Sequence, residues 1–254
     1  MRVLILGGTS EASELARLLS QDARFSPTLS LAGRTVSPDL PAVPYRIGGF
    51  GGADGLAQWI AAERIAAIVD ATHPFAARIS DNAVNAARMQ GVPLLSLVRP
   101  PWAAEAEDRW TRAESVEKAA AALGPQPRRV FLTVGRLELA VFQSAPQHSY
   151  LVRTIDAPDA SVLPPHAELL LQRGPFDEQA EIALMRSRAI EIVVAKNSGG
   201  AATYAKIAAA RRLSLPVIMI ERPPKPASMR AGNTKAALDW LAQGHTGLPS
   251  ERGV

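Results

Sequence analysis

Short apolar runs alternate with longer helical stretches along most of the chain, and this alternation restricts its fold more than any other feature. Before residue 100 the apolar runs are Val3–Leu6, Thr28–Ala32, Ala67–Ala71 and Leu94–Val98. The helical stretches between and around them are Glu11–Leu19, Gly55–Arg64 and Ala76–Gln90. Uninterrupted apolar strands separated by helices are typical of parallel sheets covered on both faces. The sequence therefore predicts an α/β fold.

The alternation pauses at VRPPWAAEAEDRW, residues 98–110, where a Pro-Pro pair and charged residues predict a segment that crosses between domains. Apolar runs then resume at Val130–Val134, Tyr150–Thr154, Leu169–Gln172, Ile192–Ala195 and Val217–Ile220. Their helical stretches are Ser115–Leu123, Leu137–Gln143, Phe176–Arg188, Ala202–Arg212 and Thr234–Gln243. We therefore expect two Rossmann-like lobes, residues 1–100 and 101–254, each a mostly parallel sheet flanked by helices, with a cleft between them.

Composition excludes several classes of protein. Without cysteine the chain has no disulfide and no thiolate nucleophile, and its four scattered histidines lack metal-site spacing, so no metal is expected. A net charge of +4 suits an anionic ligand, but an aromatic content of 5% argues against nucleic acid. No apolar run reaches the roughly 20 residues that span a bilayer, and no signal peptide is visible. We expect no membrane partner and a cytoplasmic location.

The first predicted strand runs into LILGGTSEA, residues 4–12. Strand-to-helix turns of an open parallel sheet lie at its carboxyl edge, where ligands of such folds bind. Gly7 and Gly8 let the backbone approach a ligand, while Thr9 and Ser10 can cap the next helix and donate to phosphate oxygens. Because the spacing is not G-x-G-x-x-G, a turn that only reverses the chain is the alternative interpretation.

The second predicted strand ends in SLAGRT, residues 30–35, where dinucleotide-binding folds hold the adenosine ribose. An acidic residue there would accept from a free 2′-hydroxyl, whereas Arg34 can bind a 2′-phosphate through two donors, with Thr35 beside it. This favours NADPH over NADH, unless Arg34 is a solvated surface residue. A further cluster, IGGFGG at 47–52, is either a loop that closes over the cofactor or a plain connection.

The turn VDATHPFA, residues 69–76, places His73 directly after a strand, and Pro74 presets the first turn of the next helix. His73 can protonate a substrate, bond a cofactor or merely cap the helix. A serine-hydrolase role fails because no G-x-S-x-G elbow accompanies it. The position at a carboxyl edge favours contact with a bound ligand.

The second lobe repeats the strand–glycine–helix arrangement in LTVGRLE, residues 132–138, with Gly135 and Arg136. Its most distinctive stretch is KNSGG, residues 196–200, in which consecutive amides form an anion-binding concavity and Lys196 adds a positive charge. The P-loop spacing is absent, so phosphate and carboxylate fit equally, and a capped helix with a solvated lysine is the alternative. Lys206 lies further along that helix, either near this turn or as an exposed charge.

Three segments together resemble the precorrin-6A reductase family, NADPH-dependent enzymes of cobalamin biosynthesis. They are LILGGTSEA at the start, DATHPFA in the middle and KNSGGAATYAKIAAARRLSLPVIMIERP near the end, and they occur in order over nearly the whole chain. The resemblance implies hydride transfer from NADPH to one carbon–carbon double bond of a tetrapyrrole, precorrin-6A, with a proton added to the adjacent carbon to give precorrin-6B. Neighbouring pathway enzymes are then possible partners for substrate hand-over.

This resemblance assigns roles to the nominated residues. The expected cofactor-binding residues are Gly7, Gly8, Thr9, Ser10, Glu11, Arg34, Thr35, Thr72 and His73. The expected substrate-binding residues are Gly135, Arg136, Lys196, Asn197, Ser198, Gly199 and Gly200, which can alternatively help to shape the cofactor pocket. His73 and Lys196 are the candidate catalytic proton donors, with water and the substrate's own carboxylates as alternatives. The rival functions are another nucleotide-using α/β enzyme and a non-catalytic nucleotide or tetrapyrrole carrier.

Overall fold

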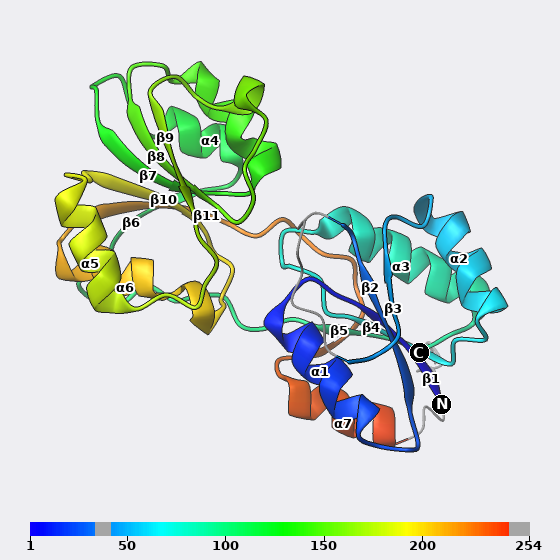
Figure 1. Cartoon of the computed structure of the whole chain (residues 1–254). Helices are drawn as coiled ribbons and strands as arrows, with labels where there is room; N and C mark the ends of the chain where they lie inside the picture. Colours follow the sequence, from blue (N-terminus) through cyan, green and yellow to red (C-terminus); the bar gives the residue numbers. More distant parts are fainter. Residues whose placement is uncertain (34–41, 244–254) are drawn as a thin grey trace, which may run out of the picture. The chain divides into compact units, whose positions relative to one another are not determined.

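The computed structural model describes residues 1–33 and 42–243, and the chain divides into two compact units (Figure 1). Unit 1 consists of Met1–Pro100 together with Pro224–Val254, and unit 2 consists of Pro101–Pro223. The expected second domain, residues 101–254, is therefore wrong at its C-terminal end. The reason is strand pairing: the chain returns after Pro223 and adds a last strand and helix to unit 1.

Unit 1 is a parallel six-stranded sheet in the order β12-β5-β4-β1-β2-β3. Its strands are β1 (Arg2–Leu6), β2 (Ser26–Leu31), β3 (Tyr45–Ile47), β4 (Ala67–Asp70), β5 (Leu94–Leu97) and β12 (Met229–Ala231). Its helices are α1 (Ser10–Ser20), α2 (Gly52–Ala62), α3 (Ala77–Gln90) and α7 (Thr234–Ala242). One core cluster joins the sheet to α1 and α7, and another joins it to α2 and α3, so both faces of the sheet are covered.

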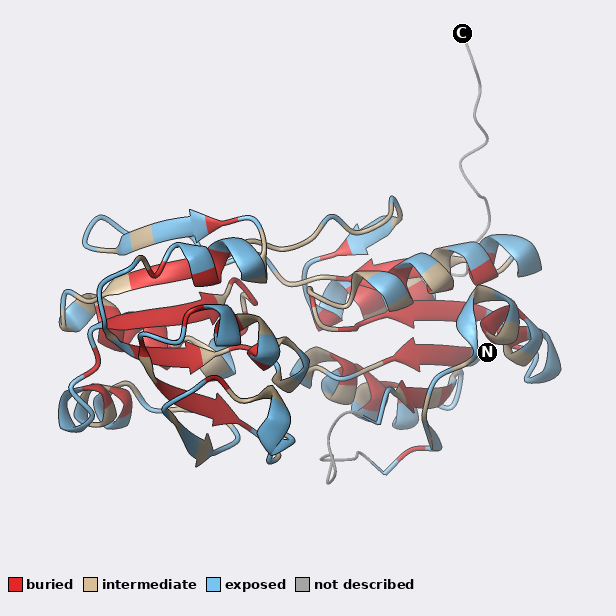
Figure 2. Cartoon of the chain, turned by 90° about the horizontal axis from the view of Figure 1, so that it is seen from above, coloured by how far each residue is buried: buried red, intermediate tan, exposed pale blue. Residues whose placement is uncertain are grey.

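Unit 2 is also a parallel six-stranded sheet, in the order β6-β11-β10-β7-β8-β9. Its strands are β6 (Arg109–Ala113), β7 (Arg129–Thr133), β8 (Ser149–Thr154), β9 (Ala167–Leu171), β10 (Ile192–Lys196) and β11 (Pro216–Ile220). The α-helices are α4 (Val116–Ala121), α5 (Glu178–Ser187) and α6 (Ala205–Arg212), and the 3₁₀ helices are η1 (Arg136–Ser144), η2 (Ala160–Val162) and η3 (Ala201–Thr203). Figure 2 shows the central strands of each sheet as the most buried segments.

The two sheets share one topology. Counted from β1 in unit 1 and from β7 in unit 2, each has the spatial order 3-2-1-4-5-6 of dinucleotide-binding folds. The sixth place is filled differently: β12 comes from the far end of the chain, and β6 comes from the segment that precedes β7. The predicted α/β class with two Rossmann-like lobes is confirmed. No helix of the described residues is long and apolar enough to cross a membrane.

Candidate functional site

In unit 1 the strand order reverses between β1 and β4, which makes this pair the topological switch point of the sheet. Ligands of open α/β sheets bind in the crevice outside the carboxyl ends of the strands at such a point. The turn after β1 contains Gly7, Gly8 and Thr9, and the turn after β4 contains Thr72 and His73. The fold thus brings these five residues, all predicted to bind the nucleotide, to one edge of the sheet.

The two glycines of the first turn serve different physical purposes. A Cβ on Gly7 would lie 2.6 Å from Leu29 Cδ1 and 3.2 Å from Leu31 Cδ2, so a side chain at this position would displace the buried Leu29. Gly8 has φ +117, a conformation that favours glycine, and no atom of residues 1–33 or 42–243 lies within 4 Å of an added Cβ. Gly7 therefore packs against the sheet, while the backbone at Gly8 is open to a ligand.

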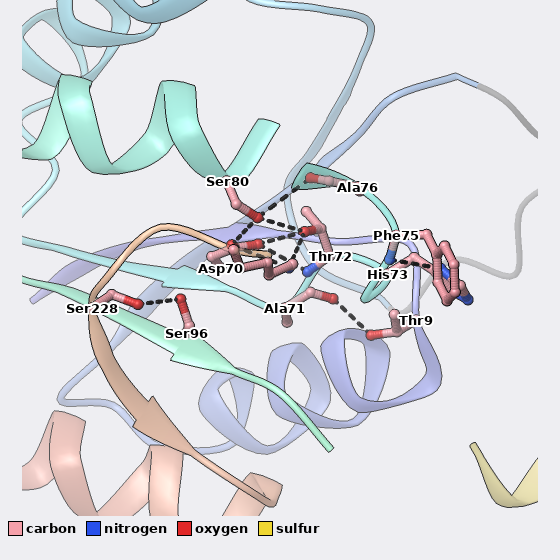
Figure 3. A network of polar contacts seen from close by, with 11 residues as sticks. Thr9, Asp70, Ala71, Thr72, His73, Phe75, Ala76, Ser80, Ser96 and Ser228 are labelled. Atoms are coloured by element: carbon pink, nitrogen blue, oxygen red, sulfur yellow. Dashed lines mark hydrogen bonds and ion pairs between the residues drawn. The ribbon is translucent and has the colours of Figure 1, made fainter. Parts of the chain in front are cut away.

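Thr9 ties the two turns of the switch point together. Its Oγ1 accepts from the backbone N–H of Ala12 at 3.2 Å, as an N-cap of α1, and donates to the carbonyl of Ala71 at 2.8 Å (Figure 3). The hydroxyl hydrogen is therefore directed at the chain itself. In this conformation Thr9 shapes the site, and its side chain is not directed at a phosphate.

A small hollow at this edge is lined by Thr9, Glu11, Thr72, Pro74, Leu97, Val98 and Arg99. Arg99 Nη1 lies 2.6 Å from Glu11 Oε2, and the two side chains are 14% and 23% exposed. The sequence predicts Glu11 as a site residue but gives no signal for Arg99, because the two residues are 88 positions apart. The pair puts a partly open cation beside the glycine turn.

Beneath the turn after β4, the carboxylate of Asp70 organises a buried network (Figure 3). Its Oδ1 accepts from the Thr72 backbone N–H at 3.1 Å and from Thr72 Oγ1 at 2.6 Å, and its Oδ2 accepts from Ser80 Oγ at 2.5 Å. Lys225 adds a buried cation 3.5 Å from Asp70 Oδ2 and donates to Thr72 Oγ1 at 3.1 Å. The Thr72 side chain is thus held inward, and the turn faces the hollow in a fixed conformation.

His73 is half-buried at the same turn. Its Nδ1 accepts from the backbone N–H of Phe75 at 3.3 Å, and the two rings lie 5.7 Å apart. Because Nδ1 is an acceptor, the proton of the neutral imidazole is on Nε2. The geometry supports a histidine that is oriented by its own turn.

Two further predictions concern segments that follow strands of unit 1. Arg34 and Thr35, predicted at the 2′-phosphate, lie outside the described residues. The IGGFGG segment is held by Arg46, which donates to the carbonyls of Gly48 and Gly49 at 2.9 and 3.0 Å and stacks on Phe50 at 3.8 Å. In this conformation the segment connects β3 to α2, and Arg46 holds it in place.

In unit 2 the strand order reverses between β7 and β10, so Gly135 and Arg136 after β7 lie across the switch point from Lys196 at the end of β10. The ammonium of Lys196 forms a short ion pair with Glu138 Oε1, and Glu138 Oε2 accepts from the Gly135 backbone N–H at 3.1 Å. The sequence gives no role to Glu138. The structure shows that it joins both sides of the switch point.

The remaining residues of the KNSGG turn are buried or half-buried. The Asn197 side chain, 4% exposed as a residue, accepts from the Trp102 backbone N–H at 2.7 Å and donates to the Trp102 carbonyl at 3.1 Å. Ser198 is buried, and its N–H donates to the Lys196 carbonyl at 2.7 Å. Gly199 has φ +71 and leads through Gly200 into η3. Asn197 therefore fixes the turn to the start of unit 2.

Lys206 is not an exposed charge. It is 6% exposed, its Nζ donates to the Thr203 carbonyl at 2.7 Å, and it lies 5.2 Å from the Trp102 ring. Burial first, and then the nearby Arg153, lower the pKa of Lys206 to about 7. Arg153 itself forms a buried bidentate pair with Glu181 at 2.7 and 2.9 Å. This charge cluster escapes sequence reasoning because its members come from separate elements.

No group of three or more His, Cys, Asp or Glu side chains among residues 1–33 and 42–243 could hold a metal ion. Two sheets with the order of dinucleotide-binding folds, with a glycine turn at the switch point of unit 1, define the chain as a Rossmann-like α/β protein. A family model described as "Precorrin-6x reductase CbiJ/CobK" matches residues 2–242. The chain belongs to this family of reductases.

Curated relatives and a solved structure agree with the family. The chain is 55% identical over 246 residues to a precorrin-6A reductase of Sinorhizobium sp, covering 95% of this chain and 94% of that protein. It is 47% identical over 253 residues to that of Rhodobacter capsulatus, covering 100% and 99%. A structure titled "CobK precorrin-6A reductase" matches with a TM-score of 0.92 at 47% identity, covering 100% of this chain and 99% of the other. The expected enzyme class, an oxidoreductase of cobalamin biosynthesis, is confirmed, and such a reductase needs a reducing cofactor.

Proposed function

We propose that the chain reduces precorrin-6A with NADPH to give precorrin-6B. One hydride adds to a carbon of a double bond in the macrocycle and one proton adds to the adjacent carbon. The curated relatives reported above are named for precorrin-6A, which supports this substrate. The single observation that carries the cofactor assignment is the switch point of unit 1, where the order 3-2-1-4-5-6 meets the open backbone at Gly8.

The residues of unit 1 fit a dinucleotide. Gly8 leaves space that a Cβ would fill, and Gly7 keeps the turn close to the sheet. When bound, the cofactor supplies the hydride, so the protein needs no nucleophile. Backbone groups of residues 7–11 would hold the pyrophosphate at the start of α1, and the turn with Thr72 and His73 would border the nicotinamide. Arg34 and Thr35 would bind the 2′-phosphate.

The residues of unit 2 fit a ligand ringed with carboxylates. Gly135, Arg136, Lys196, Ser198, Gly199 and Gly200 would bind acetate or propionate groups of the macrocycle. Asn197 would act through its two hydrogen bonds to Trp102, by keeping this turn in place. Lys196 and His73 are the two groups proposed for proton delivery, and a pH profile of kcat in Lys196→Ala and His73→Gln distinguishes them.

The test is a fluorescence titration with NADPH and, separately, with NADH, followed by the reduced-nicotinamide absorbance after precorrin-6A is added. We expect tighter binding of NADPH and loss of the absorbance band only when the macrocycle is present. Arg34→Ala should weaken NADPH binding by about 1–3 kcal/mol and leave NADH binding nearly unchanged. Arg24→Ala, at an exposed pair with Asp22, is the matched control. Binding without oxidation would instead support a carrier.

A further inference from the structure

Glu138 brings a negative charge to the place where the proposed function needs cations. It lies in the first turn of η1, directly beside the switch point of unit 2. One carboxylate oxygen is paired with Lys196 Nζ at the end of β10, and the other accepts from the Gly135 N–H after β7. A single carboxylate therefore engages one donor from each side of the switch point.

The two donors form a site whose chemistry selects a carboxylate. A backbone N–H and an ammonium that converge on one anion make charge-assisted hydrogen bonds of the strong kind. Such a pair of donors recognises the two oxygens of a carboxylate, and Glu138 supplies them from within the chain. The same donors are among those assigned above to carboxylates of the macrocycle.

The exposure of the pair allows its partner to be exchanged. The side chains of Lys196 and Glu138 are 14% and 30% exposed, whereas those of Lys225 and Asp70 in unit 1 are 8% and 1% exposed. An ion pair whose carboxylate can reach water is less costly to separate than one whose carboxylate is fully buried. The Glu138 carboxylate can therefore leave Lys196 for water at a smaller cost than the buried Asp70 carboxylate would incur on leaving Lys225.

We propose that Glu138 is a specificity-determining residue that occupies, in the absence of substrate, the carboxylate position of the macrocycle. On binding, an acetate or propionate group of the substrate replaces the Glu138 carboxylate at Lys196 and Gly135, and Glu138 turns to solvent. A tetrapyrrole without a carboxylate at this position cannot displace Glu138 and is rejected, which is selection by competition. This inference rests on the proposed role of Lys196 toward the substrate.

The test is a double-mutant cycle on the KM for precorrin-6A at saturating NADPH, in wild type, Glu138→Gln, Lys196→Ala and the double variant. We expect Glu138→Gln to lower KM by about fivefold, because the competing charge is gone. We expect Lys196→Ala to raise KM, and Glu138→Gln to lower KM by less in the Lys196→Ala background than in wild type, since Glu138 then competes only for the Gly135 N–H. Glu168→Gln, which breaks an exposed pair with Arg188, is the matched control and should leave KM unchanged.

The outcomes separate this inference from the function it rests on. If Lys196→Ala leaves KM unchanged, the proposed role of Lys196 fails and this inference fails with it. If Lys196→Ala raises KM but Glu138→Gln raises it or leaves it unchanged, the exchange alone is overturned. Glu138→Asp withdraws the carboxylate by one methylene and should lower KM in the same direction by a smaller factor, which keeps the test open if Glu138→Gln folds poorly.

Discussion

Units 1 and 2 have the same strand order but place their lysines differently at the switch point. In unit 1 Lys225 lies beneath the turn, buried against Asp70 and bonded to Thr72. In unit 2 Lys196 lies at the end of its strand, partly open, and is paired with Glu138. The first arrangement fixes the backbone of the turn after β4, whereas the second leaves an ion pair whose carboxylate is partly exposed to water. Under the functions proposed above, the same topology would bind a pyrophosphate in unit 1 and substrate carboxylates in unit 2.

The comparison predicts its largest difference when each lysine is replaced by methionine. Lys225→Met leaves the Asp70 carboxylate buried with no cation, so the free energy of unfolding should fall by about 3 kcal/mol. Lys196→Met leaves Glu138, which water can reach, and should cost less than about 1 kcal/mol. Chemical denaturation of both variants measures the difference. Equal losses would mean that the two pairs serve the same structural purpose.

The glycines of the two switch points provide the second test. Gly7→Val would drive its side chain into Leu29 and Leu31, so we expect the turn to shift at a cost of about 2 kcal/mol and NADPH affinity to fall about thirtyfold. Gly135 has φ −69 and ψ 148, which any residue adopts, and among the described residues an added Cβ meets Glu138 Oε2 alone, at 3.3 Å. Gly135→Val should therefore leave the Kd for NADPH unchanged. If Gly135→Val instead weakens NADPH binding, the proposed placement of the cofactor in unit 1 is wrong.

The buried Lys206 of unit 2 should make the stability of the protein depend on pH. The pKa of Lys206 is lowered to about 7 by burial and by Arg153, with Glu181 acting in the opposite direction. Above this pH the unfolded chain still binds the proton that the folded chain has released, so stability rises with pH until the unfolded lysine also titrates. We expect a gain of about 2 kcal/mol between about pH 7 and pH 9 that Lys206→Met lacks. Thermal unfolding across this range measures it, and a parallel profile in Lys206→Met would contradict it.

The smallest effect is expected at the pair of Arg99 and Glu11, a partly exposed ion pair of unit 1. Arg99→Gln should change the free energy of unfolding by less than about 1 kcal/mol, because both side chains are within reach of water. The effect should diminish as salt is added. Denaturation at low and high ionic strength checks this, with Lys235→Gln in the exposed pair with Asp239 as the control. A loss as large as that of Lys225→Met would show that openness does not govern these pairs.

The sequence predicts most of the fold because buried parallel strands can be recognised as local apolar runs. Val3–Leu6 and Ile192–Ala195 are examples in which pattern and burial agree. It misses β6 because the residues RWTRA are mostly polar and exposed at a sheet edge, and it misses β12 because three residues form no pattern. Short edge strands are defined by the neighbour that they pair with, which local sequence does not contain.

The candidate site is predicted where it follows strand ends and missed where it depends on distant partners. The turns at Gly7 and Lys196 are found because glycines and polar residues directly follow apolar runs. The pairing of Lys225 with Thr72 spans 153 positions, and that of Lys196 with Glu138 spans 58. These contacts form only when the chain folds. A local sequence pattern that predicts a turn therefore does not show which charged side chain lies beneath it.

Unit 1 is built from two segments of the chain that lie on either side of unit 2 in the sequence, and this limits when it can finish folding during synthesis. Unit 1 lacks β12 and α7 until the ribosome has translated all of unit 2, because Met229–Ala231 and Thr234–Ala242 follow Pro223 in the chain. Until then, β5 stays at an unfinished edge of the sheet, and Lys225 cannot neutralise Asp70. The N-terminal unit therefore begins first and finishes last, and the turn proposed to border the nicotinamide is completed only after the segment that follows Pro223 has been synthesised.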